Sequence, residues 1–152
     1  MQQFLLKTNA VALLLVALFS LSAKAGGEYY RIFLNNKLLF ERHESEPLDL
    51  KSLPLDNASP TDQLVIYYSH CGAVGESRQL SVRDENGKIL KQWKYADTND
   101  KKGGMSIPVK ELLALKQAAG GGLNLYYVSK QLPKGCTLAA LRSKVNRPIG
   151  RS

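Results

Sequence analysis

The segment Leu64 to Cys71 constrains the fold of this 152-residue chain more than any other. Its apolar side chains alternate between two faces, with Leu64, Ile66 and Tyr68 on one and Val65, Tyr67 and Cys71 on the other. A strand that is apolar on both faces lies in the interior of a sheet, where other elements cover it. We therefore expect a β-rich domain built around this strand.

Further β-prone runs, separated by turn residues, lie on both sides of this segment. The expected strands are Tyr29–Leu34, Leu38–Glu41, Arg78–Asp84, Lys88–Tyr95, Leu123–Ser129 and Cys136–Leu141. The turn sequences Asn35-Asn36-Lys37 and Glu85-Asn86-Gly87 predict two hairpins. Residues 47–60 contain three prolines, which predicts a long loop with a short edge segment at most.

One short helix is expected before the last two strands. Ser106 is the expected N-cap, and Pro108 fits the first turn, where its missing N–H costs nothing. The three glycines that begin at Gly120 are expected to end the helix. Six or seven short strands with one short helix in a connection predict a mainly β fold, an antiparallel β-sandwich. A partly open barrel and an α+β sheet with the helix on one face are the alternatives.

Residues 1–25 predict a secretory signal peptide. Lys7 precedes an apolar run from Ala10 to Leu21, and the small-x-small pattern for cleavage ends at Ala25. A membrane anchor is the alternative, but the apolar run is shorter than the stretch of about 20 residues that spans a bilayer. We expect cleavage after Ala25 and a secreted or periplasmic product with no transmembrane segment. It would consist of one β-rich domain over 26–141 and a flexible basic tail over 142–152.

Cys71 and Cys136 are the only two cysteines of the chain. In an exported protein, such a pair predicts one disulfide. His70 beside Cys71 also suggests a thiol nucleophile with its base. Adjacent residues of a strand point to opposite faces, however, so His70 is not expected to activate Cys71.

The formal net charge of the whole chain is +8, and the positive charge gathers in its C-terminal half. No acidic residue follows Glu111. The candidate contacts for an anionic ligand are Lys130, Lys134, Arg142, Lys144 and Arg147. The partners expected from this charge are an anionic glycan, an envelope surface or an acidic protein. Nucleic acid is not an expected partner, because export removes most nucleic acid targets. A solvated surface that serves solubility is the alternative.

Six of the seven tyrosines form the doublets Tyr29-Tyr30, Tyr67-Tyr68 and Tyr126-Tyr127. Each doublet lies in an expected strand and therefore sends one ring to each face of its sheet. Tyr67 and Tyr126 are candidates for stacking on a sugar or a base, provided that their strands are neighbours. The alternative is that tyrosine favours half-buried strand positions for packing alone.

No motif of the chain indicates a cofactor or a metal. Acidic residues surround His43, at Glu41, Glu44, Glu46 and Asp49, but their spacing matches no calcium loop, and the histidines and cysteines lack zinc spacing. The sequence therefore predicts an exported, non-enzymatic β-rich domain that binds a partner through its basic C-terminal half. A small secreted hydrolase or thiol enzyme that uses Cys71 and His70 is the alternative function.

Overall fold

The computed structural model describes residues 27–43, 46, 50–98 and 103–142 of the chain. The predicted signal peptide lies outside these residues. So does the predicted basic tail, apart from Arg142.

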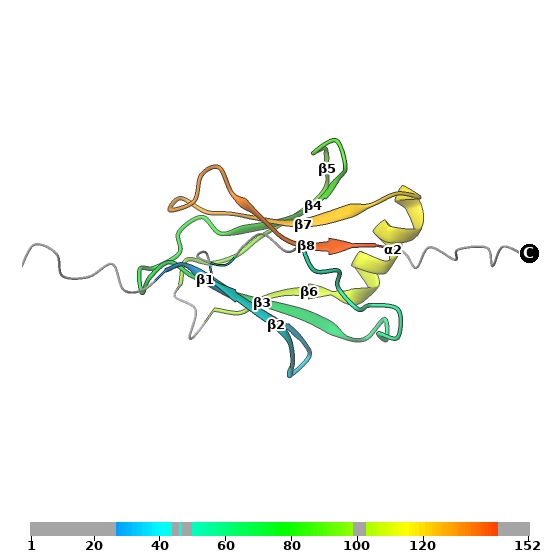
Figure 1. Ribbon diagram of the computed structural model, residues 1–152, viewed down its shortest axis with the longest axis horizontal. Helices are drawn as coiled ribbons and strands as arrows, with labels where there is room; N and C mark the ends of the chain where they lie inside the picture. The colour runs from blue at the N-terminus through cyan, green and yellow to red at the C-terminus, as the bar shows by residue number, and fades with distance from the viewer. Residues whose placement is uncertain (1–26, 44–45, 47–49, 99–102, 143–152) are drawn as a thin grey trace, which may run out of the picture.

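The described residues form two four-stranded antiparallel sheets that stack face to face (Figure 1). Sheet A has the strand order β2-β1-β3-β6, and sheet B has the order β5-β4-β7-β8. The strands are β1 (Tyr29–Leu34), β2 (Lys37–His43), β3 (Gln63–Ser69), β4 (Gln79–Asp84), β5 (Ile89–Lys94), β6 (Met105–Pro108), β7 (Leu123–Val128) and β8 (Cys136–Leu141). The predicted mainly β sandwich is therefore confirmed.

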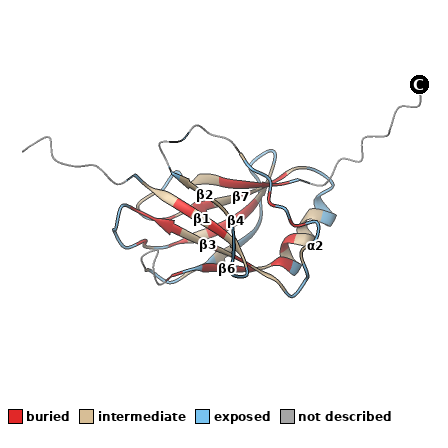
Figure 2. Cartoon of the chain, turned by 60° about the horizontal axis from the view of Figure 1, so that its bottom comes forward, coloured by how far each residue is buried: buried red, intermediate tan, exposed pale blue. Residues whose placement is uncertain are grey.

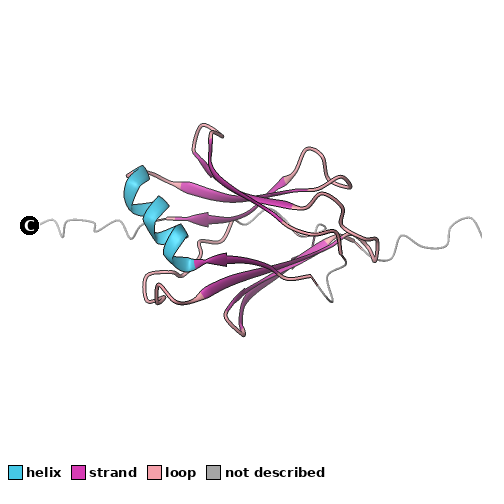
Figure 3. Cartoon of the chain, turned by 180° about the vertical axis from the view of Figure 1, so that it is seen from behind, coloured by secondary structure: helices cyan, strands magenta, loops and turns pink. Residues whose placement is uncertain are grey.

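The helix α2 (Val109–Ala119) connects the two sheets, because it follows β6 of sheet A and precedes β7 of sheet B. It lies across one end of the sandwich rather than on the face of one sheet (Figure 3). The helix is thus in a connection, as predicted, and the alternative of an α+β sheet with a helix on one face is wrong. No helix in the described part of the chain is long and apolar enough to cross a membrane.

The start of the helix differs from the prediction. Ser106 is not the N-cap, because it belongs to β6, where its hydroxyl donates to Gln63 Oε1 at 2.8 Å. The helix begins after Pro108, whose backbone is extended, and it has no side-chain cap. Its other end agrees with the prediction, since Gly120 closes it in the left-handed conformation with φ of 61°.

The core lies between the two sheets, where one face of every central strand is buried (Figure 2). The inner side chains of β3 are Leu64, Ile66 and Tyr68, as the alternation predicted. The outer side chains Val65 and Tyr67 are half-buried, so the outer face of β3 is not part of the core. Sheet B faces β3 with the buried side chains Leu80, Val82, Leu123, Leu125 and Tyr127.

The segment between β2 and β3 crosses from one sheet to the other. Its Lys51–Leu53 portion pairs with the outer edge of β8 through two hydrogen bonds at Ala140, of 3.0 and 2.8 Å. Leu53 and Leu55 of the same segment enter the core. The expected short edge segment within this proline-rich loop is confirmed, and it covers only the C-terminal half of β8.

Arg78 ties the connection between β3 and β4 to the connection between β5 and β6, at the opposite end from α2. Its guanidinium is buried and donates to Ala96 O, at 2.8 and 2.7 Å, and to Gly103 O at 2.7 Å. Burial lowers the pKa of Arg78 from its usual value. The carbonyl oxygens that it binds satisfy the cation and fix the loops around it.

We predict that Gly135→Ala lowers the free energy of unfolding by about 2 kcal/mol or more. Gly135 leads into β8 with φ of 68°, and an added Cβ would lie 2.5 Å from the backbone oxygen of Tyr127. Urea denaturation measures the change. Gly121→Ala is the control, because the nearest neighbour of its added Cβ would be the backbone oxygen of Ala119 at 3.8 Å, so a change within about 0.5 kcal/mol is expected. Equal losses in the two variants would contradict the prediction.

Candidate functional site

The three tyrosine doublets place one ring each inside the sandwich. The inner rings are Tyr30 of β1, Tyr68 of β3 and Tyr127 of β7. Tyr68 stacks on Tyr30 with 6.1 Å between ring centroids and on Tyr127 with 4.3 Å. The three rings therefore form a continuous stack that joins sheet A to sheet B.

Each buried tyrosine hydroxyl has a hydrogen-bond partner. Tyr30 donates to Leu138 O of β8 at 2.7 Å, and Tyr68 donates to Glu28 Oε2 at 2.8 Å. The hydroxyl of Tyr127 lies 3.0 Å from Nε2 of His70. Burial raises the pKa of Tyr30 and of Tyr68, and it raises the pKa of Tyr127 to about 12. All three hydroxyls therefore keep their protons near neutral pH.

His70 links the two sheets directly. Its Nδ1 lies 3.0 Å from Glu28 Oε1, next to β1 of sheet A. Its Nε2 lies 3.0 Å from the Tyr127 hydroxyl and 3.1 Å from Ser129 Oγ, at the end of β7 in sheet B. Only 2% of the His70 side chain is exposed. A carboxylate can only accept, so Nδ1–H donates to Glu28, and Nε2 is left for the two hydroxyls.

Glu28, His70 and Ser129 have the connectivity of a nucleophilic triad, which is a carboxylate, an imidazole and a hydroxyl in a row. Their surroundings do not suit that chemistry. Ser129 is 3% exposed, and its Oγ also accepts the backbone N–H of Leu132 at 3.1 Å. The following loop is fastened by Lys130, whose ammonium lies 2.7 Å from Glu76 Oε2. The row is therefore a satisfied internal network rather than an accessible catalytic centre.

A groove opens between β2 and β8, the edge strands on one side of the sandwich. We call it the edge groove. One compartment, of about 340 Å³, is lined by Tyr30, Phe40, Glu41, Arg42, Glu46, Lys51 and Leu138. The other, of about 260 Å³, is lined by Glu28, Tyr30, Arg42, His43, Tyr68, Cys136 and Thr137. Both compartments share Tyr30 and Arg42, so they adjoin each other.

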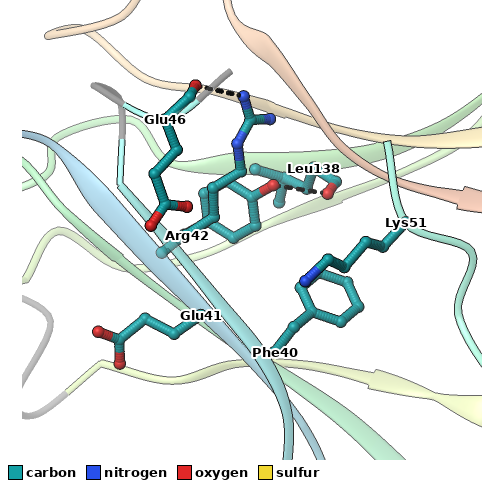
Figure 4. Close-up of a pocket in the computed structure, with 7 residues that line it drawn as sticks. Phe40, Glu41, Arg42, Glu46, Lys51 and Leu138 are labelled. Carbon is teal, nitrogen blue, oxygen red and sulfur yellow. Dashed lines mark hydrogen bonds between the residues drawn. The ribbon is translucent and has the colours of Figure 1, made fainter. Parts of the chain in front are cut away.

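Arg42 is the central charge of the edge groove. It pairs with Tyr30 across β1 and β2, so it occupies an inward-facing position of its strand. Its Nη2 donates to the backbone oxygen of Glu46 at 3.1 Å, as Figure 4 shows. In the same view the carboxylate of Glu41 is directed away from this contact, whereas Lys51 enters from the segment beside β8. This compartment thus combines the cations Arg42 and Lys51 and the carboxylates of Glu41 and Glu46 with the aromatic and aliphatic side chains of Tyr30, Phe40 and Leu138.

The carboxylate of Glu28 forms the other charged part of the edge groove. It accepts from Tyr68 through one oxygen and faces His70 through the other. Its side chain is 21% exposed, and it lines the compartment that also contains Arg42. A buried network therefore reaches the groove at the Glu28 carboxylate and at Tyr68, which donates to it.

The predicted disulfide is absent from the structure. Cys71 and Cys136 are both free cysteines and are not at disulfide distance. Cys71 lies in the turn after β3 with φ of 56°, followed by Gly72 with φ of 85°, and this left-handed turn leaves its side chain exposed. Cys136 faces the other way, into the groove, with Sγ 3.9 Å from the Tyr68 hydroxyl. His70 points into the sandwich and does not serve Cys71.

The residues predicted to contact an anionic partner are spread over the surface. Lys130 and Lys134 lie in the connection between β7 and β8, whereas exposed Arg142 follows the far end of β8. Lys130 is already paired with Glu76. Lys144 and Arg147 lie outside the described residues.

The two candidate stacking residues also lie apart. Tyr67 is on the outer face of sheet A, where its ring meets the edge of Phe33 at 5.6 Å between centroids. Tyr126 is on the outer face of sheet B, where the guanidinium of Arg83 lies 3.7 Å from its ring centroid. No single face therefore presents both rings.

The acidic cluster around His43 does not form a metal site in the described part of the chain. Glu44 and Asp49 lie outside it. The groove residues Glu28, Arg42 and Lys51 were missed by the sequence reasoning. Arg42 carried one usable signal, since it alternates with apolar Phe40 on the inward face of β2, where a charge is unusual.

Comparison of the chain with protein-family models, with curated proteins and with solved structures found no match. The candidate site therefore rests on geometry alone.

We predict that His70→Ala lowers the free energy of unfolding by about 3 kcal/mol, because it removes a buried imidazole and the hydrogen bonds that Glu28 Oε1 and the Tyr127 hydroxyl make with it. The fluorescence of the single tryptophan, Trp93, follows unfolding in urea. His43→Ala is the control, because that imidazole is 48% exposed and is expected to change stability by about 0.5 kcal/mol at most. If His70→Ala proves as harmless as the control, the network does not hold the sheets together.

We further predict two titratable thiols per chain in the native protein under non-reducing conditions. Cys71 is exposed and should react first with a thiol reagent, whereas half-buried Cys136 should react more slowly. Cys71→Ser and Cys136→Ser assign the two phases. The absence of any thiol before reduction would show that the disulfide forms after all.

Proposed function

We propose that this chain is an exported, non-enzymatic binding domain whose ligand site is the edge groove. The observation that carries the proposal is the position of Arg42, a guanidinium that faces inward between two sheet edges and lines both compartments. A concave site with a largely apolar floor and a few converging polar groups is typical of ligand binding. Export is supported by the N-terminal sequence pattern alone.

The lining of the groove holds the carboxylates of Glu28, Glu41 and Glu46 as well as two cations, Arg42 and Lys51, and it is these cations that suit an anionic group of a ligand. Arg42 has five N–H donors, of which one binds Glu46 O and another interacts with the Tyr30 hydroxyl, and Lys51 adds a second cation to the same compartment. A guanidinium binds carboxylate or phosphate oxygens in a planar, bidentate way. The proposal keeps the anionic partner expected from the net charge and moves its site from the C-terminal basic residues to Arg42 and Lys51.

A thiol enzyme has less support from the geometry. Both nitrogens of His70 face partners within the network, so none is directed at Cys71. Ser129 is enclosed, as described above. These positions favour binding over nucleophilic catalysis for the residues of this region.

The proposal predicts that Arg42→Met weakens the binding of a carboxylate by about tenfold or more, because a charge-assisted hydrogen bond is lost. The probes are acetate, benzoate, N-acetyl-leucine and leucine, titrated into the ¹⁵N-labelled protein and followed by NMR. Wild type should show saturable shifts with one of them at least, and these should weaken at high salt.

Arg83→Met is the matched control, because Arg83 lies against Tyr126 on the outer face of sheet B. It should bind the same probe as wild type does. Binding of no probe, or equal binding by the Arg42 and Arg83 variants, would contradict the proposal.

A further inference from the structure

We infer that the ligand of the edge groove is a zwitterion, a free amino acid or a short peptide, whose ammonium binds Glu28 and whose carboxylate binds Arg42. The inference rests on the proposed function and names the ligand class of the same site. It is carried by the presence of one anionic and one cationic side chain in a single compartment.

Glu28 retains capacity to accept further hydrogen bonds. An ionised carboxylate has about four acceptor positions, and Glu28 uses one for Tyr68 and one for His70. These two contacts fix the carboxylate in place, so a ligand does not bear the entropic cost of ordering it. Its exposed side faces the compartment and suits an ammonium group, which carries three donors.

Arg42 supplies the positive charge of the same compartment. Its position is fixed by β2 and by the contact of Nη2 with Glu46 O. Glu28 is held by His70 and Tyr68, and Arg42 is held by a backbone carbonyl, so each charge has supports of its own. A ligand that brings both an ammonium and a carboxylate complements the two charges together.

The same arrangement discriminates against simpler ligands. A ligand with a carboxylate alone would meet the negative charge of Glu28 within the compartment, and one with an amine alone would meet Arg42. Each mismatch costs affinity, which is how a site of mixed charge selects its ligand.

The size of the groove sets the length of the ligand. The compartment that contains both charges measures about 260 Å³, just below the usual range of small-molecule sites, so it suits an amino acid or one end of a peptide. The adjoining compartment of about 340 Å³ has Phe40 and Leu138 on its walls and can receive an apolar side chain. A peptide of two residues with apolar side chains is therefore a suitable first probe.

Isothermal titration calorimetry with the dipeptide Leu-Leu tests the inference. Wild type should bind Leu-Leu, and both N-acetyl-Leu-Leu and Leu-Leu amide should bind about tenfold more weakly or worse, because each lacks one charge. Leucine and Leu-Leu-Leu, measured beside them, establish whether the free amino acid or a peptide is preferred. Equal affinity for Leu-Leu and its acetylated and amidated forms would overturn the inference.

Two variants assign the charges to their residues. Glu28→Gln should weaken Leu-Leu while leaving the affinity for N-acetyl-Leu-Leu unchanged or higher, and Arg42→Met should weaken Leu-Leu while sparing Leu-Leu amide. Glu85→Gln and Arg83→Met are the matched controls, since Glu85 is exposed in a turn and Arg83 lies on the outer face of sheet B. Leu-Leu binding that none of the groove variants alters would place the peptide elsewhere and overturn the inference.

A measurement on the unaltered protein guards against variants that fail to fold. Cys136 lines the same compartment as Glu28 and Arg42, whereas Cys71 lies outside it on the surface. Leu-Leu should slow the alkylation of Cys136 and leave that of Cys71 unchanged. Unchanged alkylation of Cys136 at saturating Leu-Leu would contradict the inference.

The failure of this inference and the failure of the proposed function give different results. If benzoate or N-acetyl-leucine binds in an Arg42-dependent way but Leu-Leu gains nothing from its free amine, the edge groove is an anion site and the zwitterion is wrong. If no probe, charged at either end or at both, depends on Arg42, both proposals are wrong.

Discussion

The interaction on which the rest of the structure depends is the set of three hydrogen-bond contacts that His70 makes across the sandwich. Nδ1 faces Glu28 beside sheet A, and Nε2 faces Tyr127 and Ser129 of sheet B. A β-sandwich is otherwise joined by apolar contact, which fixes separation better than lateral position. A buried imidazole with a partner on each side adds a directional link, because leaving either nitrogen unsatisfied would cost about 1–3 kcal/mol.

The polar groups that take part in this link are of two kinds. His70, Ser129 and Tyr127 are enclosed and satisfied, so they serve the fold. Glu28 belongs to the same network and also lines the edge groove, together with Arg42 of the edge strand β2. The buried network can therefore hold a binding carboxylate in position, as a supporting set of hydrogen bonds does in a pre-organised site. Glu28 therefore belongs both to the network that joins the sheets and to the proposed binding site.

The sequence predicted the fold well because the alternation of side chains is a local property. Leu80 and Val82 face inward as expected, and each tyrosine doublet sends one ring to the core. Strand β6 was missed because its four residues follow a polar, glycine-rich loop, and their strand conformation comes from pairing with β3. The predicted disulfide was wrong because the direction of the Cys71 side chain depends on a left-handed turn at that residue, which the sequence pattern did not indicate. The groove could not be predicted, because it arises where β2 and β8 meet, strands that are far apart in sequence.

The direct test of this account is an NMR measurement of the imidazole ring nitrogens and their protons in the ¹⁵N-histidine-labelled protein. The chain has two histidines, so the spectrum contains one enclosed ring, His70, and one exposed ring, His43. If His70 links the two sheets, one ring retains a slowly exchanging proton on Nδ1, this signal is lost in a His70 variant, and the other ring exchanges rapidly. Two rapidly exchanging rings with averaged tautomers would contradict a locked link between the sheets, and with it the support proposed for Glu28 in the edge groove.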